Sequence, residues 1–319
     1  MDIASSSLFF IIEIICRGVH GRTLIRFRHQ DRLALRLFPS HNVFGARARS
    51  KNGATERKNV LERKRALGKR VSHGVTRRVD GERFPPLITP VRLREKDDAF
   101  EHARRHAAEA GAGTLFHVGR FDLIEFALVL EPEEPLAAAR RAIFAGMNAL
   151  ADTIAAACPP ERDVRFGYPG TLTFDDGLVG GARLAWPEGA GEADVPDWLV
   201  FAAMIRTGGF QELGFVLDPS ATTLEEAGFT DVDPTDFAAR FCRHFMTEVD
   251  DWQHGGFKGV GQRYLSRLPR GAGDGMRGID GNGDLLIHPK AGGGAARTPL
   301  LPALAQAAWF DPATGVPRA

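Results

Sequence analysis

The sequence predicts an α/β (α+β) protein in which a mixed or antiparallel sheet is flanked by helices and followed by a small β domain. Three observations lead to this fold class. Apolar segments of period two alternate with segments of helical period across residues 81–268. The turn signal Asp175-Asp176-Gly177 joins two such strands directly, which predicts an antiparallel hairpin. After Pro269 the pattern changes to glycine-rich turns and short strands, so residues 269–319 form the predicted small domain.

The chain of 319 residues has ordinary globular composition, with 44% hydrophobic and 25% charged residues, but its charge is unevenly divided. Residues 1–80 contain 18 Lys and Arg against 6 Asp and Glu, whereas residues 81–319 contain the remaining 23 against 34. The acidic body excludes nucleic acid as its main partner, because phosphate binding needs clustered cations. The basic segment lacks the apolar pattern of a core, and we expect a disordered or non-native leader there. A nucleic-acid or organelle-targeting arm is the alternative.

The body begins with a helix, two strands and a long helix. The amphipathic pattern of residues 98–110 predicts a helix that ends at Gly111. Residues 114–118 predict a strand, and residues 123–130 predict a second strand with one strongly apolar face. The apolar stripe of residues 136–157 then predicts one continuous helix.

Four strands follow the long helix. Short runs at residues 164–166, 171–174 and 182–186 predict strands, and the hairpin turn joins the last two. Residues 198–206 form the most continuous apolar run, which predicts a strand at the centre of the sheet.

Two helices and several short strands complete the chain. Asp233 and Pro234 predict the N-cap and first residue of a helix that Gly255-Gly256 ends. A further amphipathic pattern predicts a helix over residues 257–268. The strands expected in the C-terminal domain cover residues 277–279, 285–288 and 298–301.

The three cysteines, Cys16, Cys158 and Cys242, include no CxxC pair and give no disulfide framework. Their number favours a reducing, cytoplasmic compartment, with structural thiols at Cys158 and Cys242. The apolar run of residues 8–16 is much shorter than the ~20 residues that span a bilayer. We therefore expect no membrane partner.

Two local patterns resemble binding motifs without meeting their requirements. His102 and His106 are one helical turn apart, as metal ligands can be, but charged neighbours predict a solvated helix face. Residues 273–278 match GxGxxG, but they lie in a loop before a strand, and a dinucleotide site needs the motif after a strand. We therefore predict no metal site and no dinucleotide site.

The order of elements and the segment 164–183 resemble the biotin/lipoate A/B protein ligase family over residues 84–270. The family has a Lys-Trp-Pro-Asn-Asp strand, a short hairpin and then Lys-x-x-Gly-Ile-Leu. Tyr168-Pro169 match the Trp-Pro, and Gly181 matches the glycine after the second lysine at the same spacing. The C-terminal strands suit the small SH3-like domain that often ends these ligases.

The resemblance implies an ATP- and Mg²⁺-dependent ligase. Family members activate biotin, lipoate or octanoate as an acyl-adenylate and transfer the acyl group to a lysine of an apo biotinyl or lipoyl carrier domain. Such chemistry modifies a protein and requires cations around the polyphosphate and the reacting phosphorus.

This sequence departs from the family at the positions that would carry those cations. Gly167 and Leu178 stand where the family has its two lysines, and Gly170-Thr171 replace the Asn-Asp. Leucine carries no charge and donates no hydrogen bond. The loop that orders the adenylate is reduced to residues 119–122. The catalytic residues are therefore not identified by the resemblance.

Arginines are the candidate replacements for the missing lysines, because a guanidinium group can hold a phosphate or carboxylate through two parallel hydrogen bonds. Arg206, at the end of the predicted central strand, is one of these candidates. Tyr168 and Trp186 are candidates to line an apolar acyl slot, and packing in the core is the alternative role for both. The predicted substrate-binding residues are Arg120, Tyr168, Pro169, Gly180, Gly181 and Arg183.

The departures leave three functions open. The first is a ligase with relocated cations. The second is a non-catalytic relative that binds an acyl group, a nucleotide or a carrier domain. The third is an acyltransferase that uses an acyl-carrier thioester and needs no ATP.

Overall fold

The computed structural model describes residues 83–157, 163–208, 220–230 and 232–318, together with two short strands near the N-terminus. The chain divides into two units, one of Ile12–Arg78 and one of Met1–Ile11 with Val79–Ala319. In the smaller unit, β1 (Ile14–Ile15) and β2 (Leu24–Ile25) form an antiparallel pair. The rest of the predicted leader lies outside the described residues.

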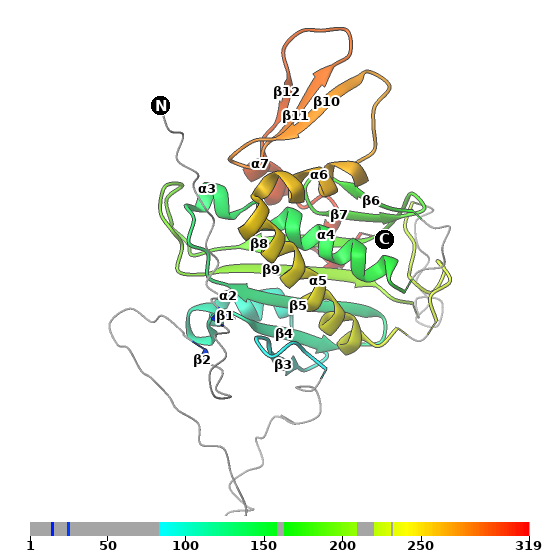
Figure 1. Ribbon diagram of the computed structural model, residues 1–319. Coiled ribbons are helices and arrows are strands. Elements are labelled where there is room, and N and C mark those ends of the chain that lie inside the picture. The colour runs from blue at the N-terminus through cyan, green and yellow to red at the C-terminus, as the bar shows by residue number, and fades with distance from the viewer. Residues whose placement is uncertain are drawn as a thin grey trace, which may run out of the picture. The chain divides into compact units, whose positions relative to one another are not determined.

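A seven-stranded mixed sheet forms the centre of this unit, in the order β3-β4-β5-β9-β8-β7-β6 (Figure 1). β3 and β4 are parallel, and all other neighbours are antiparallel. β5 and β9 are buried along their whole length, which confirms the predicted central strand. The strands are β3 (Thr89–Leu93), β4 (Thr114–Gly119), β5 (Leu123–Leu130), β6 (Val164–Gly167), β7 (Thr171–Phe174), β8 (Gly177–Ala185) and β9 (Leu199–Arg206).

Two strands differ from the sequence prediction. β3 was not predicted, because this half-exposed edge strand is short, lacks an apolar alternation and contains Pro90. β8 begins at Gly177, five residues earlier than predicted. The first half of β8 shows no alternation of apolar and polar residues in the sequence, because the pairing register shifts opposite Leu172-Thr173 and residues 180 and 181 are both glycine.

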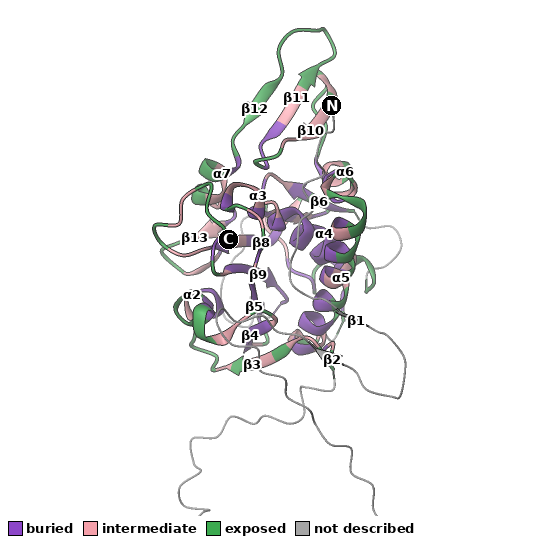
Figure 2. Ribbon diagram, turned by 60° about the vertical axis from the view of Figure 1, so that its left-hand side comes forward, coloured by how far each residue is buried: buried purple, intermediate pink, exposed green. Residues whose placement is uncertain are grey.

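Helices α4 (Ala142–Ala155), α5 (Pro234–Gly255) and α6 (Phe257–Arg267) cover one face of the sheet (Figures 1 and 2). The prediction of one helix over 136–157 was wrong, because α3 (Leu136–Ala139) is separated from α4. At the break, Arg140 donates to Glu192 Oε1 at 2.8 Å and Arg141 to Glu134 Oε2 at 2.8 Å. The two guanidinium groups therefore anchor the break to different segments.

The other face of the sheet is covered by α2 (Ala99–Ala110) and by the C-terminal end of the chain. α2 starts one residue after the predicted start, because Asp98 is its N-cap and its side chain accepts from the amide of Glu101 at 2.9 Å. It ends at Gly111, whose φ of 75° suits a residue without a side chain. Its buried alanines pack against β4, β5 and β9.

The predicted C-terminal strands fall in one sheet, and the structure adds a separate pair of strands that was not predicted. β10 (Asp274–Ile279), β11 (Leu285–Pro289) and β12 (Ala296–Thr298) form an antiparallel sheet that extends away from the central sheet (Figure 1). The strand predicted over 298–301 was wrong beyond Thr298, because Pro299 opens helix α7 (Leu300–Gln306). Asp284 fixes this start by accepting from the amide of Leu300 at 2.8 Å. β13 (Phe310–Asp311) and β14 (Val316–Pro317) form the last pair.

The start of α5 gives the first testable prediction. Asp233 is the N-cap as predicted, and its carboxylate accepts from the amide of Asp236 at 2.9 Å. Asp233→Ala leaves this amide without its acceptor, and we expect the free energy of unfolding to fall by about 1 kcal/mol in urea denaturation. Glu109→Ala, at an exposed site of α2, is the matched control and should change it by less than about 0.5 kcal/mol. Equal effects of the two substitutions would contradict the capping role.

Candidate functional site

The candidate site lies on the sheet face that α2 only partly covers. Leu123 of β5 pairs with Arg206 of β9, and Glu125 pairs with Met204. Met204 in turn pairs with Gly181 of β8. Because alternate residues of a strand point to the same side, these residues share one face. We call this the site face: Leu123, Glu125, Gly181, Arg183, Met204 and Arg206.

Arg183 is the central cation of the site face. Its guanidinium lies between two aromatic rings, 4.0 Å from the ring centre of Phe100 and 4.2 Å from that of Phe310. Its Nη2 is 3.5 Å from a carboxylate oxygen of Asp98 and makes no hydrogen bond within the described part of the chain. Burial lowers the pKa of Arg183, and the nearby carboxylates act in the opposite direction. Such a cation, stacked but not fully hydrogen-bonded, suits an added anion.

Arg120 lies in the tight connection between β4 and β5, as the sequence predicts. Its Nε and Nη2 donate to the two carboxylate oxygens of Asp122, at 2.9 Å and 2.5 Å. These hydrogen bonds raise the pKa of Arg120, and they lower that of Asp122 although burial alone would raise it. The charge of Arg120 is therefore already matched inside its own loop.

Glu125 is a site residue that the sequence analysis missed. Its side chain is buried, and Oε1 accepts from the amide of Ala99, the first residue of α2, at 2.6 Å. Burial raises the pKa of Glu125 to about 7. The signal was a single charged residue inside the apolar run of residues 123–130, because a buried charge in a strand needs a partner.

Leu178 and Gly181 both meet the C-terminal end of the chain. Leu178, which the resemblance matched to the family's second lysine, packs against the apolar cluster of Leu123, Met204 and Trp309. A side-chain carbon on Gly181 would come within 2.6 Å of the Trp309 ring, so the glycine makes room for the indole. The same construction at Gly180 would meet the Met204 carbonyl oxygen at 2.0 Å, so Gly180 is required by strand packing.

Of the other predicted residues, Tyr168 lies apart from the site face, and Pro169 lines a hollow beside that face. The hydroxyl of Tyr168 donates to the Gly283 carbonyl at 2.8 Å, and its ring joins the core under the helices. Pro169 accepts from the Tyr264 hydroxyl at 2.9 Å. Gly167 ends β6 near Thr171, and Trp186 packs against the same core with Arg140 over its ring. The structure does not bring Tyr168 and Trp186 to Arg183 as one slot.

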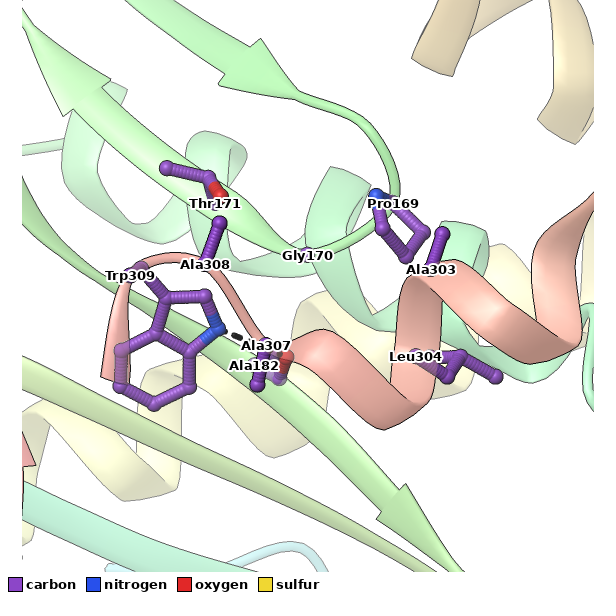
Figure 3. A pocket seen from close by; sticks show the side chains of 9 residues that line it. All are labelled: Pro169, Gly170, Thr171, Ala182, Ala303, Leu304, Ala307, Ala308 and Trp309. Atoms are coloured by element: carbon purple, nitrogen blue, oxygen red, sulfur yellow. Dashed lines mark hydrogen bonds between the residues drawn. The ribbon is translucent and has the colours of Figure 1, made fainter. Parts of the chain in front are cut away.

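A small hollow opens beside the site face, between the Pro169–Thr171 turn, β8 and α7 (Figure 3). The Trp309 indole closes one side, and its Nε1 donates to the Ala182 carbonyl at 3.2 Å. Alanines and Leu304 supply most of the remaining wall. The hollow therefore has no charged group to hold a phosphate.

Other candidate chemistry from the sequence does not add to this site. His102 and His106 stack on α2 with ring centres 4.3 Å apart, and burial lowers the pKa of His102. Within the described ranges, no group of three or more His, Cys, Asp or Glu side chains could hold a metal ion. Cys242 is buried in α5, which raises the pKa of its thiol to about 12, whereas Cys16 and Cys158 lie outside the described residues. No helix of the described part is long and apolar enough to cross a membrane.

The fold and site face define a ligase-type α/β domain, with helices on one face of a mixed sheet and polar residues gathered on the other. The biotin/lipoate A/B protein ligase family matches residues 84–266, more than half of the chain, so the protein belongs to that family. This confirms the resemblance inferred from the Tyr168-Pro169 and Gly181 positions.

Solved structures support the same fold. A biotin protein ligase-like protein of unknown function from Silicibacter sp. TM1040 has 24% identity and a TM-score of 0.59, over 70% of this chain and 99% of its own. Apo biotin protein ligase from Aquifex aeolicus has 15% identity and a TM-score of 0.52, over 67% and 96%. A mutant of the Aquifex aeolicus ligase, solved in complex with biotin, has 14% identity and a TM-score of 0.50, over 67% and 97%. No curated protein matches the sequence.

Proposed function

We propose that this protein binds a small apolar carboxylic acid on its site face and does not convert it to an acyl-adenylate. It is thus a non-catalytic relative of the ligases. The observation that carries the proposal is Leu178. The family position for the second lysine holds a leucine that packs into an apolar cluster on the site face.

The charges around the site do not fit ATP. Three arginines were predicted as replacement cations. Arg120 and Arg183 face three carboxyl groups, those of Asp98, Asp122 and Glu125, and Arg206 already donates to the carbonyl oxygens of Pro317 and Arg318. A polyphosphate brings several negative charges and needs an excess of cations. Asp122 already accepts hydrogen bonds from two nitrogens of the Arg120 guanidinium. These residues therefore do not fit ATP and Mg²⁺, and no adenylation step follows from them.

A single carboxylate attached to an apolar chain fits these residues better. Arg183 can supply one cation, and Leu123, Leu178 and Met204 supply an apolar floor. Binding sites of this kind are mostly apolar and have a few convergent polar groups. A mutant of the Aquifex aeolicus ligase, which has the same fold, was solved in complex with biotin, which is also a carboxylic acid.

The test combines acyl transfer with direct binding on the full chain. ATP, Mg²⁺ and biotin, lipoate or octanoate are mixed with the protein and with apo biotinyl and lipoyl domains, and intact masses are recorded. We expect no mass gain on either acceptor, and we expect isothermal titration without ATP to detect binding of at least one acid. Arg183→Leu should weaken that binding at least about tenfold, and Arg165→Leu, at an exposed arginine of β6, is the control.

A mass gain that requires ATP would overturn the proposal in favour of a ligase with relocated cations. The observation that favours this alternative is the position of Arg183, two residues after Gly181 on the site face. A gain from an acyl-carrier thioester without ATP would instead identify an acyltransferase.

A further inference from the structure

The last residues of the chain lie on the site face. The C-terminal segment, defined as residues 308–318, includes the pair β13–β14 and contacts β8 and β9. Trp309 is its anchor, with 2% of its surface exposed, and it packs on Leu123 and Met204. The segment therefore covers the apolar floor on which we place the ligand.

The segment also occupies the polar groups of the site face. The Arg206 guanidinium donates to the carbonyl oxygens of Pro317, at 2.6 Å, and of Arg318. The Phe310 ring stacks on one side of the Arg183 guanidinium, and the Trp309 indole donates a hydrogen bond to the Ala182 carbonyl. Both cations at the centre of this face thus have a partner from the C-terminal segment. The segment therefore occupies the surface that a bound ligand would contact.

The contacts that hold the segment can be released without opening the main core. Leu123, Met204 and Trp309 form an apolar cluster that is separate from the two larger clusters on either side of the sheet. β13 and β14 pair with each other, Phe310 opposite Pro317, and the hydrogen bonds named above tie the segment to the sheet through side chains. Undocking it would therefore break no strand pairing of the central sheet.

A pivot lies directly before the segment. Ala307, the residue after α7, has φ 32° and ψ 63°, in the left-handed region that non-glycine residues seldom adopt. The chain turns there from the helix toward the sheet (Figure 3). A change at this one residue would redirect everything that follows, as hinge residues do.

We propose that the C-terminal segment is a lid that closes the site face in the free protein and leaves it when an acid binds. This inference rests on the proposed function for the identity of the ligand. The segment and the acid compete for the floor beneath Trp309 and for Arg183, so the observed affinity is reduced by the fraction of closed molecules.

Hydrogen–deuterium exchange of the full chain tests whether the lid opens. The Arg318 amide donates to the Trp309 carbonyl and the Phe310 amide to the Ala307 carbonyl, both within residues 307–318. Exchange in peptides over 308–318 therefore reports the loss of this folded arrangement, which Trp309 and Arg206 hold against the sheet. Without ligand we expect these amides to exchange faster than those of β5 and β9, and octanoate should accelerate them further. Exchange at the rate of global unfolding would overturn the lid. Octanoate binding that leaves these amides unchanged would also overturn it.

Two variants separate a lid from a structural plug. Phe310→Ala and Trp309→Ala weaken docking, and we expect them to tighten octanoate binding by roughly tenfold in isothermal titration. Met276→Ala, at a site of β10 that is 72% exposed and outside the segment, is the control and should leave binding unchanged. A plug that only supports the fold would give equal or weaker binding in the two lid variants.

Failure of the lid and failure of the proposed function give different results. If neither the wild type nor the Trp309→Ala variant binds any acid, the proposed function fails. Exchange without ligand still tests the lid in that case. If the amides of residues 308–318 open at a free energy below that of global unfolding, the lid is supported. If they open only when the whole protein unfolds, the lid is overturned.

Discussion

Glu248→Ala should lower the free energy of unfolding by about 2–3 kcal/mol. Glu248 of α5 is buried and accepts from Asn148 of α4 at 3.0 Å. It also accepts from Arg263 of α6, at 2.8 Å from Nε and 2.9 Å from Nη2. Removing the carboxylate leaves the fully buried amide of Asn148 short of an acceptor, and buried donors without acceptors are costly. Arg263 is partly exposed and keeps Asp251, which limits the loss.

Urea denaturation followed by circular dichroism measures this effect. Asp250→Ala is the matched control on the same helix, because Asp250 is exposed and its partner is the exposed His254. We expect the control to change the free energy of unfolding by less than about 0.5 kcal/mol. If Glu248→Ala were as mild as the control, the carboxylate would not be what joins the three helices.

The sequence predicted those parts of the fold whose cause is local. β5 and β9 are buried on both faces, so their apolar runs identify them as central strands. Asp98 and Asp233 cap the helices that follow them, and Gly111 ends the first, because each signal acts within one helical turn. The break at Arg140-Arg141 escaped prediction, since Glu192 is 52 residues away from the arginine that it holds.

The candidate site was predictable only in part for the same reason. Leu178 and Gly181, to which the family resemblance drew attention, both lie in β8, although the sequence predicted that strand only from residue 182, and the short connection at Arg120 was predicted from the sequence. The C-terminal segment was not visible, because Trp309 reaches Ala182 from 127 residues further along the chain. Its two strands have only two residues each, which is too short to show a hydrophobic alternation in the sequence.

Glu125→Gln should make the stability of this protein less dependent on pH. The pKa of Glu125 is raised by burial from 4.5 to about 7 in the folded protein. Between these values the folded state binds more protons than the unfolded state, so the free energy of unfolding falls as pH rises. The contribution is fully present below pH 4.5 and is lost as pH rises through about 7. The loss amounts to about 3 kcal/mol at most.

Glutamine keeps an oxygen that can accept from the amide of Ala99 but does not ionise. At about pH 5 we therefore expect the variant and the wild type to unfold at similar urea concentrations. At about pH 8 the variant should be more stable, by up to about 3 kcal/mol. The difference between the free energies of unfolding of the variant and the wild type, taken at each pH, removes the contribution of groups that titrate far from residue 125. An equal difference at both pH values would show that Glu125 does not titrate between them.

The same carboxyl connects stability to the proposed binding of an acid. Ionised Glu125 adds a negative charge near Arg183, which would oppose a bound carboxylate, whereas protonated Glu125 leaves that cation available. Octanoate should therefore bind the wild type more tightly at about pH 6 than at about pH 8 in isothermal titration. Glu125→Gln should bind equally at both values, because its side chain stays neutral. A variant that kept the wild-type pH dependence would place the acid away from Arg183.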